Sequence, residues 1–201
     1  MADTGRRIVR SSITEEKLEY LLKEKRVIFL MGPVSIHTPT GLALEIFGSE
    51  FEKDKEKPVW VVILSNGGDI YSGLATYDLL KSLGEKGVPV YTVGVGLVAS
   101  VAVPILQAGT KRFCFPNTQI VIHQASLHGL DGGEVNMLDD EVKNSLKLNS
   151  RVLDIICARS GVAKEQLIND TKKTDFLLNA EEAMKYGPHG LVDEVIATLP
   201  F

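Results

Sequence analysis

Short runs of apolar residues alternate along this chain with longer, partly polar segments. Valine- and isoleucine-rich runs of this length are typical of strands buried on both faces of a parallel sheet. We expect strands over residues 27–30, 58–64, 88–95, 112–115 and 119–123, and helices over about 14–25, 38–51, 71–83, 100–108, 164–170 and 180–186. This repeated strand-helix order predicts an α/β fold with a mostly parallel sheet and right-handed crossovers.

The segment from Gly132 to about Ser160 differs from the rest, because it is predicted to form one long helix. Gly161 is a suitable residue to end such a helix. Six apolar residues fall on roughly one of its faces, namely Val135, Leu138, Val142, Leu146, Val152 and Ile156. A small domain cannot cover a helix of this length, so we expect it to project and to pack against another subunit.

The composition is that of one compact domain. The chain has 201 residues, of which 44% are hydrophobic, and such a chain can bury a core without disulfides. We therefore expect a single domain over residues 1–201, with a polar and flexible segment at 1–11. The net charge of −4 and the lack of a basic cluster with interleaved aromatic residues argue against nucleic acid as a partner.

Targeting and redox features favour a reducing compartment. No run of about 20 apolar residues occurs, so we expect no membrane span, and the N-terminal residues lack the apolar centre of a signal peptide. Cys114 and Cys157 lie in apolar contexts, where buried free thiols are the common outcome. The expected location is the cytoplasm, or the plastid or mitochondrial matrix if a transit peptide has been removed.

Three residues have the chemistry of a hydrolytic triad. Ser100 follows one predicted strand, His123 ends another, and Asp175 comes later in the chain. A serine hydroxyl becomes a good nucleophile when a neutral imidazole takes its proton, and an acid fixes the tautomer of that imidazole. The order Ser, His, Asp along the chain differs from the familiar orders, but geometry rather than order defines a triad.

An oxyanion hole can be formed from backbone donors near Ser100. The N–H of Val101 lies beside Ser100 at a helix start, and Gly68 follows a predicted parallel strand, where a glycine lets substrate approach the backbone. Taken singly, such a serine is more often a helix cap, the histidine a structural residue and the Gly67-Gly68 pair an ordinary turn. Their occurrence together predicts a serine hydrolase.

Several stretches match one family, and they lie at 26–34, 65–68, 73–78, 96–102, 111–117, 122–124 and 180–187. On these, from about Leu21 to Leu199, the chain resembles the ClpP family, the proteolytic subunits of ATP-dependent Clp proteases. The resemblance implies a ClpP/crotonase-like fold and a serine peptidase without a cofactor. It implies Ser100 as nucleophile, His123 as base, and Gly68 with Val101 as the oxyanion hole.

The resemblance also implies an assembly. The family stacks two heptameric rings around the active sites, receives unfolded polypeptide from an AAA+ ATPase, and joins its rings through a handle that corresponds here to about 124–160. We expect a homo-oligomer of this kind, or a mixed ring with a paralogue. The family's N-terminal axial-loop pattern is absent. The family also usually has aromatic residues at both of the positions that are Trp60 and Val62 here, in the strand of the pocket that receives the ATPase. A different ATPase partner, or weaker coupling to it, therefore stays open.

The position of the acid is the main departure from the family. Counting forward from Asp170-Thr171 places the family's aspartate at Thr174, whereas counting back from 180–183 places it at Asp175. A one-residue insertion reconciles the two counts, and Asp175 is the predicted acid. The other departures are Asn66 and Ala125, each in place of a proline, and Val101 in place of a methionine.

Other functions fit the sequence less well. A catalytically weak or inactive ring subunit of the ClpR type is the first alternative, favoured by the uncertain acid and opposed by the retained Ser100 and His123. The stretch 94–99 matches a dinucleotide-binding G-x-G-x-x-A pattern, but no acidic residue ends a strand about 20 residues further on. A crotonase-like acyl-CoA enzyme would not need the Ser100 and His123 pair. The four histidines, His37, His123, His128 and His189, lack the spacing of metal ligands.

Overall fold

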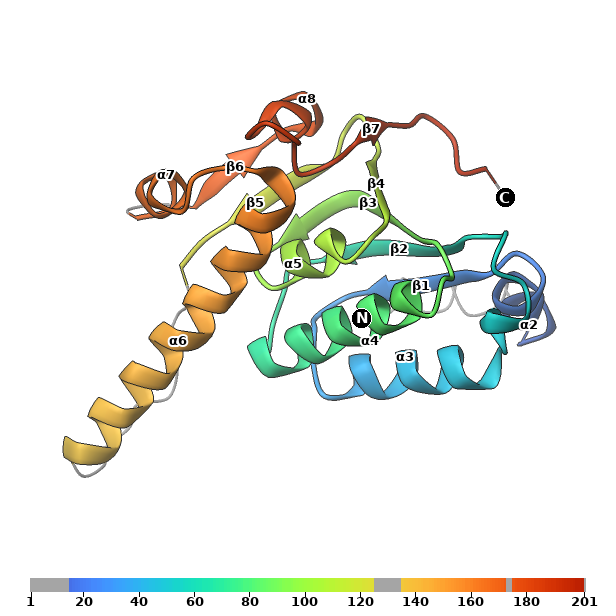
Figure 1. The fold of residues 1–201 in the computed structure, drawn as a ribbon, viewed down its shortest axis with the longest axis horizontal. Helices are drawn as coiled ribbons and strands as arrows, with labels where there is room; N and C mark the ends of the chain where they lie inside the picture. The colour runs from blue at the N-terminus through green and yellow to red at the C-terminus, as the bar shows by residue number, and fades with distance from the viewer. Residues whose placement is uncertain (1–14, 125–134, 173–174, 201) are drawn as a thin grey trace, which may run out of the picture.

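The computed structural model of this protein describes residues 15–124, 135–172 and 175–200. Within these ranges seven strands form a single sheet, and helices pack around it (Figure 1). None of the described helices is long and apolar enough to cross a membrane. The predicted flexible segment at 1–11 and the predicted helix caps Ser12 and Thr14 lie outside the described residues.

The sheet is almost entirely parallel, as predicted. Five strands pair in parallel in the order β1 (Val27–Met31), β2 (Val59–Ser65), β3 (Val90–Ala99), β4 (Lys111–Cys114) and β7 (Glu194–Val195). The long strand β3 has a second parallel neighbour, β5 (Gln119–Ile122), because residues 91–94 pair with β4 and residues 97–99 pair with β5. The short strand β6 (Phe176–Leu178), which the pattern did not predict, pairs antiparallel with β5.

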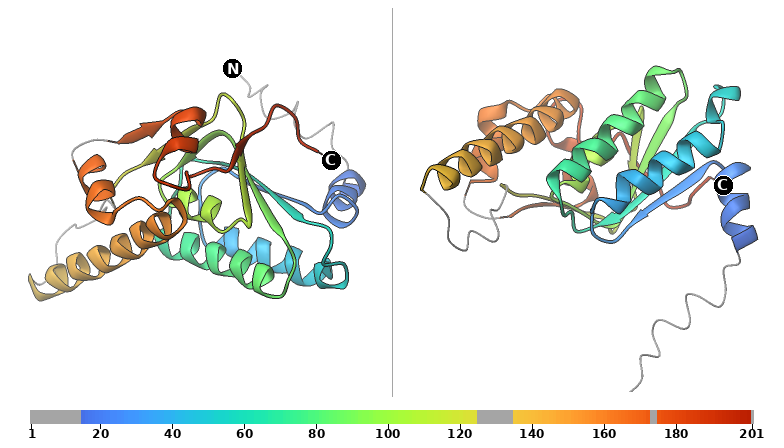
Figure 2. Two further views of the ribbon diagram at one scale, coloured as in Figure 1. Left: turned by 45° about the horizontal axis from the view of Figure 1, so that its top comes forward. Right: turned by 90° about the horizontal axis from the view of Figure 1, so that it is seen from below.

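Helices cover the sheet and extend beyond it. They are α2 (Glu15–Lys23), α3 (His37–Gly48), the 3-10 helix η1 (Phe51–Lys53), α4 (Ile70–Glu85), α5 (Ala102–Gln107), α6 (Val135–Ser160), α7 (Lys164–Asp170) and α8 (Ala180–Lys185). Helices α3 and α4 run side by side across one face of the sheet, and α6 projects away from it (Figures 1 and 2). The α/β class and the projecting long helix are thus both confirmed.

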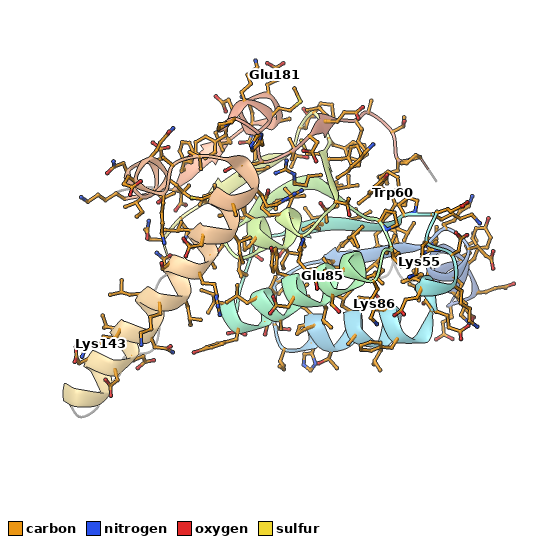
Figure 3. All side chains as sticks on the ribbon, viewed as in Figure 1. Lys55, Trp60, Glu85, Lys86, Lys143 and Glu181 are labelled. Atoms are coloured by element: carbon orange, nitrogen blue, oxygen red, sulfur yellow. The ribbon has the colours of Figure 1, made fainter. Side chains whose placement is uncertain are left out.

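The apolar face predicted along α6 is divided between two environments. Near its C-terminal end, Leu153 and Ile156 are buried in the core of this chain. Further out, Leu146 is 64% exposed, and Lys143 lies on the projecting part of the helix (Figure 3). The described helix begins at Val135, and the predicted start at Gly132 lies outside the described residues.

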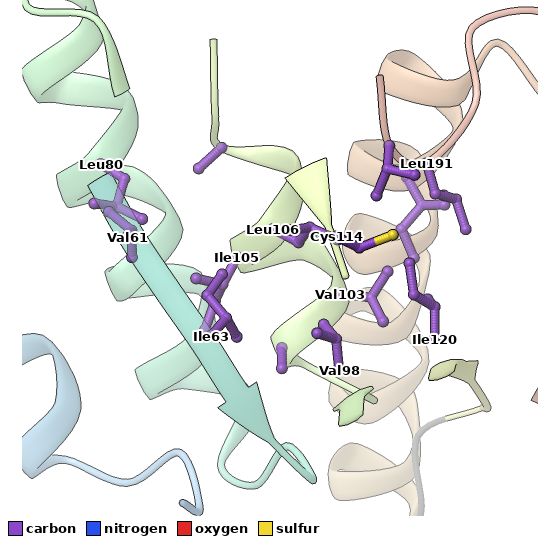
Figure 4. Close-up of a cluster of buried hydrophobic side chains, with 14 of the residues drawn as sticks. Val61, Ile63, Leu80, Val98, Val103, Ile105, Leu106, Cys114, Ile120 and Leu191 are labelled. Carbon is purple, nitrogen blue, oxygen red and sulfur yellow. The ribbon is translucent and has the colours of Figure 1, made fainter. Parts of the chain in front are cut away.

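The hydrophobic core lies between the sheet and the helices that cover it. Valine and isoleucine side chains of β2, β3 and β5 meet leucine and isoleucine side chains of α4 and α5, as Figure 4 shows for Val61, Ile63, Leu80, Val98, Ile105, Leu106 and Ile120. Cys114 is fully buried in this core, and burial raises the pKa of its thiol to about 11. Both cysteines are free thiols.

Two helix boundaries differ from those expected. Helix α3 ends at Gly48 rather than near Phe51, because Glu50 adopts a left-handed backbone that begins η1. The helix predicted from Ser100 begins at Ala102, because β3 continues past Val95 as far as Ala99. Ser100 therefore lies in the turn between strand and helix.

A buried arginine ties the C-terminal segment to the sheet. Arg112 of β4 is 2% exposed and forms an ion pair with Asp193. Its guanidinium also donates to Gln107 Oε1 at 2.8 Å and to the Gly190 carbonyl at 2.9 Å, and its backbone N–H donates to Asp193 at 2.7 Å. Burial alone would raise the pKa of Asp193, but the hydrogen bonds and the charge of Arg112 outweigh it, so that pKa lies below its ordinary value.

We expect Asp193→Asn to lower the free energy of unfolding by about 2 kcal/mol at pH 7, because Arg112 is left buried without its counter-charge. The loss is smaller than for a fully buried pair, because the Asp193 side chain is 37% exposed. Because the pKa of Asp193 is lowered in the folded state, its carboxylate stabilises the fold fully at pH values above its pKa in the unfolded chain, which is about 3.9. This stabilisation is lost as the pH falls through the pKa of Asp193 in the folded state. Urea unfolding at several pH values measures both effects.

The matched control is Asp139→Asn, which removes the partner of the exposed Lys143 on α6. It should change the free energy of unfolding by less than about 0.5 kcal/mol throughout. If the difference in free energy of unfolding between wild type and Asp193→Asn stayed constant from pH 7 to strongly acidic pH, the role given to the Asp193 carboxylate would be contradicted.

Candidate active site

Ser100 occupies a strained turn at the carboxyl end of β3. Its φ angle is +56°, in the left-handed region that residues other than glycine adopt rarely. The turn is fixed on both sides, since the Ser100 N–H donates to the Val121 carbonyl at 2.9 Å and the Ser100 carbonyl accepts from the Val103 N–H at 2.9 Å. A sharp strand-to-helix turn of this kind presents the serine hydroxyl at the edge of the sheet.

The loop after β2 lies directly against Ser100. A Cβ atom at Gly67 would lie 2.6 Å from Ser100 Cβ, and one at Gly68 would lie 2.1 Å from the Val34 carbonyl oxygen. Both glycines also have positive φ angles, +87° and +152°. Glycine is thus required at each position by space and by backbone conformation.

Two backbone N–H groups beside Ser100 remain available. Val34 bridges to the loop in parallel fashion, donating to the Gly67 carbonyl at 2.8 Å and accepting from the Asp69 N–H at 2.9 Å. In such a bridge the N–H of the middle residue, Gly68, points away from Val34. Within the described part of the chain, neither the Gly68 nor the Val101 N–H donates to a protein atom. Free donors next to a serine hydroxyl are what an oxyanion hole needs.

His123 follows β5, the strand next to the end of β3. Its Nδ1 atom lies 2.7 Å from the carbonyl oxygen of Gln124. Because a carbonyl can only accept, this hydrogen bond places the imidazole proton on Nδ1 and leaves the Nε2 lone pair free to act as a base. No hydrogen bond joins His123 to Ser100 in the described part of the chain.

Four of the five predicted site residues meet at one cavity. The cavity measures about 490 Å³, and Ser100, His123, Gly68 and Val101 all line it. The pairing of Ala99 with Val121 brings the ends of β3 and β5 together at this point. Apolar side chains complete much of the wall, among them Ile70, Ile122, Leu148 and Val152. A mainly apolar pocket with a few convergent polar groups is typical of a substrate site.

Asp175, the fifth predicted residue, is exposed and does not line this cavity. It directly precedes β6, whose last pair with β5 at this end is Ile122 with Phe176. The pairing ends there, and a continuation of the antiparallel register by one step would bring Asp175 opposite His123. Thr174, the competing position, lies outside the described residues.

The cavity also contains residues that sequence reasoning did not select. Ser145 and Asn149 reach it from α6, and Asn66 and Asp69 reach it from the loop after β2. Asp69 caps α4 by accepting from the Ser72 N–H at 2.8 Å. Its position just before the predicted helix could have identified it as a capping residue. Nothing in the local pattern identifies Asn149, because it meets Gln124, 25 positions away, only in the folded chain.

Two of the alternative chemistries can be compared with the structure. Residues 94–99 lie inside β3, so the G-x-G-x-x-A stretch does not form the loop that would hold a pyrophosphate at a helix N-terminus. In the described ranges, no three histidine, cysteine, aspartate or glutamate side chains gather where they could hold a metal ion.

Comparison with known proteins decides the family. The family model described as Clp protease matches residues 11–199. The chain belongs to the Clp protease family. It is similar to the solved structure of a mutant of ClpP1 from Listeria monocytogenes, with 27% sequence identity and a TM-score of 0.77. The match covers 90% of this chain and 96% of that one. The resemblance seen in the sequence is therefore confirmed, and the chain is a Clp-type peptidase with the ClpP fold.

We expect Gly68→Ala to distort the loop beside Ser100, because its Cβ would overlap the Val34 carbonyl. Peptide hydrolysis should fall by about 100-fold or more if a donor to the oxyanion is displaced. The change is measured as kcat/KM on a fluorogenic peptide, with circular dichroism to verify folding.

Gly84→Ala in α4 is the matched control, since a Cβ there meets nothing within 4 Å. It should leave kcat/KM unchanged and raise the free energy of unfolding by about 0.5–1 kcal/mol through helix propensity. Full activity in Gly68→Ala would show that this backbone N–H is dispensable.

Proposed function

We propose that this Clp-type peptidase is a serine endopeptidase that cleaves unfolded polypeptides, with Ser100 as nucleophile and His123 as base. One observation carries the proposal: one cavity is lined by the left-handed Ser100 turn, by His123, and by Gly68 and Val101, whose N–H groups have no acceptor within the described residues. Together these groups are of the kinds that acyl transfer needs, namely a nucleophile, a base and donors for an oxyanion.

The proposed reaction has two halves. His123 Nε2 takes the proton of the Ser100 hydroxyl as its oxygen attacks the scissile carbonyl, and the N–H groups of Gly68 and Val101 stabilise the oxyanion. The imidazolium then gives its proton to the leaving amine, and an acyl-enzyme remains. A water molecule, deprotonated by His123, attacks the ester and releases the second product, which restores the Ser100 hydroxyl.

Asp175 is the proposed acid of the triad. Its support is the register of β5 and β6, because one step beyond the pair Ile122 and Phe176 would bring Asp175 opposite His123. In that role its carboxylate would accept the hydrogen bond from His123 Nδ1–H that the Gln124 carbonyl accepts in this structure. A carboxylate at this position stabilises the imidazolium better than a carbonyl does, since it carries a full charge.

Assembly and partners form part of the proposal. Val142 and Leu146 on α6 are exposed apolar residues that suit burial against another subunit, which supports two stacked heptamers or a mixed ring with a paralogue. Trp60, Tyr91 and Phe113 form an aromatic cluster across β2, β3 and β4, with ring centroids 5.0–5.8 Å apart. Trp60 belongs to the strand where the family receives its ATPase, so we propose an AAA+ unfoldase as the partner that supplies substrate. We propose the cytoplasm as the location of both proteins.

A structural ring subunit of the ClpR type is the second candidate. Two observations favour it, namely the lack of a Ser100–His123 hydrogen bond in the described part of the chain and the place of Asp175 outside the cavity lining. The free N–H groups and the positive φ of Ser100 are features that such a subunit would not need.

Ser100→Ala is expected to abolish peptide hydrolysis, because it removes the hydroxyl that attacks the scissile carbonyl. The oligomeric state, measured by native mass spectrometry, should stay that of the wild type. Ser82→Ala, an exposed serine on α4, should keep full activity in the same assay. Equal hydrolysis by Ser100→Ala and wild type would eliminate the proposed mechanism.

Asp175→Ala should lower kcat far more than Thr174→Ala does, by about 100-fold or more against less than threefold. The reason is that a carboxylate carries the full charge that stabilises the His123 imidazolium, whereas a threonine hydroxyl does not. Steady-state kinetics on one fluorogenic peptide compares the two variants directly. The reverse ranking would align the family's aspartate position with Thr174 and show that the assumed insertion is misplaced.

A further inference from the structure

Asp69 adds a charge to the wall of the cavity that holds Ser100. Its side chain is exposed, and among the described residues that line this cavity it is the one carboxylate. The other polar side chains of the wall are those of serine, asparagine and histidine, and the remaining residues are apolar or glycine. A lone carboxylate in such a wall distinguishes ligands by their charge.

Two hydrogen bonds fix the direction of this carboxylate. Asp69 Oδ1 accepts from the Ser72 backbone N–H at 2.8 Å and also from the Ser72 hydroxyl. Neither bond uses Oδ2, which keeps its capacity to accept. In the described part of the chain, Asp69 forms no ion pair with a lysine, arginine or histidine. The helix cap therefore holds the charge in place, and no other side chain neutralises it.

The position of Asp69 in the chain places it next to the reacting bond. In the proposed reaction, the Gly68 N–H binds the carbonyl oxygen of the scissile peptide. The Cα atom of Asp69 is the next one along the chain, about 3.8 Å from that of Gly68. A substrate whose carbonyl is held by Gly68 therefore passes close to Asp69. Lysine and arginine carry their charge on a long flexible stem, so a basic residue beside the scissile bond can reach the carboxylate.

The charge of Asp69 also acts on the transition state. The oxyanion that forms at the Gly68 and Val101 N–H groups is negative, and a nearby carboxylate raises its energy by repulsion. A cationic side chain of the substrate offsets that repulsion and adds an attraction to Asp69. A basic substrate therefore gains more in the transition state than a neutral one, and this difference appears in kcat/KM.

We propose that Asp69 is a specificity-determining residue that favours substrates with a lysine or arginine next to the scissile bond. The inference rests on the proposed function, because it takes Ser100 as the nucleophile and Gly68 as a donor to the oxyanion. It names a substrate class for that site, namely unfolded segments of basic character. The apolar part of the cavity wall suits the methylene stem of the same side chain.

The test uses quenched fluorescent peptides in pairs that differ only in arginine or citrulline. Citrulline has nearly the size of arginine and no charge. The exchange is made at each of the two residues on either side of the scissile bond, which mass spectrometry of the products identifies. At one or more of these positions, the assembled wild type should have a kcat/KM about three- to fivefold higher for arginine, the effect of one partly exposed ion pair. Added sodium chloride should reduce this preference, because salt screens exposed charges.

Asp69→Asn removes the charge and keeps an acceptor that can cap α4. This variant should lose the preference for arginine over citrulline. The ratio of the two kcat/KM values is the readout, because a change beside Gly68 can alter the rate on every peptide. Asp69→Ser, which also caps helices, serves the same purpose if Asp69→Asn does not assemble. The control is Asp78→Asn, which removes an exposed carboxylate of α4 outside the cavity and should keep the wild-type ratio.

Peptide binding gives a second readout that does not depend on hydrolysis. Ser100→Ala cannot cleave the peptides, so fluorescence anisotropy measures the Kd of each member of a pair. The arginine peptide should bind about twofold or more tightly than the citrulline peptide. The difference should vanish when Asp69→Asn is combined with Ser100→Ala.

The outcomes separate this inference from the function on which it rests. An active wild type with equal kcat/KM for arginine and citrulline at all of the positions would overturn the specificity role alone, and so would a preference that persists in Asp69→Asn. A wild type that hydrolyses no peptide would overturn the proposed function, and the binding comparison would still decide whether Asp69 selects basic residues.

Discussion

The left-handed turn at Ser100 is the constraint on which the rest of the site depends. A serine with a φ angle of +56° costs about 1–3 kcal/mol relative to a relaxed backbone, so the surrounding structure must hold it there. Hydrogen bonds to Val121 and from Val103 fix the peptide groups on either side. Gly67 allows the loop after β2 to lie against the serine side chain, where any larger residue would force the two apart.

The branching of the sheet brings the other groups to this turn. Strand β3 leaves β4 after Gly94 and pairs with β5 from Leu97 onward, while β2 accompanies it along its length. Consequently the loop after β2, the turn after β3 and the end of β5 all reach one edge of the sheet. Backbone donors, nucleophile and base gather there because parallel strands end together.

Local patterns in the sequence predicted most of the core, and together with the family resemblance they predicted four of the residues that line the candidate site. Valine-rich runs located the central strands, and the helical period located α6. β6 escaped prediction, because Phe176–Leu178 is too short for a pattern and is a strand only by pairing with β5. The end of β3 at Ala99 was also missed, because the predicted strand stopped at Val95, whereas pairing with β2 and β5 continues the strand to Ala99. The hydrogen bond between Gln124 and Thr171 joins residues 47 positions apart, and no local pattern encodes it.

The central claim is that the fold activates Ser100, and intact-mass analysis after treatment with a fluorophosphonate tests it most directly. This reagent phosphonylates a serine only when a base and an oxyanion hole act on its hydroxyl. The account predicts one adduct per chain on the assembled protein, and none on the Ser100→Ala variant. An assembled wild-type protein that gains no adduct, or an adduct that persists in Ser100→Ala, would contradict it.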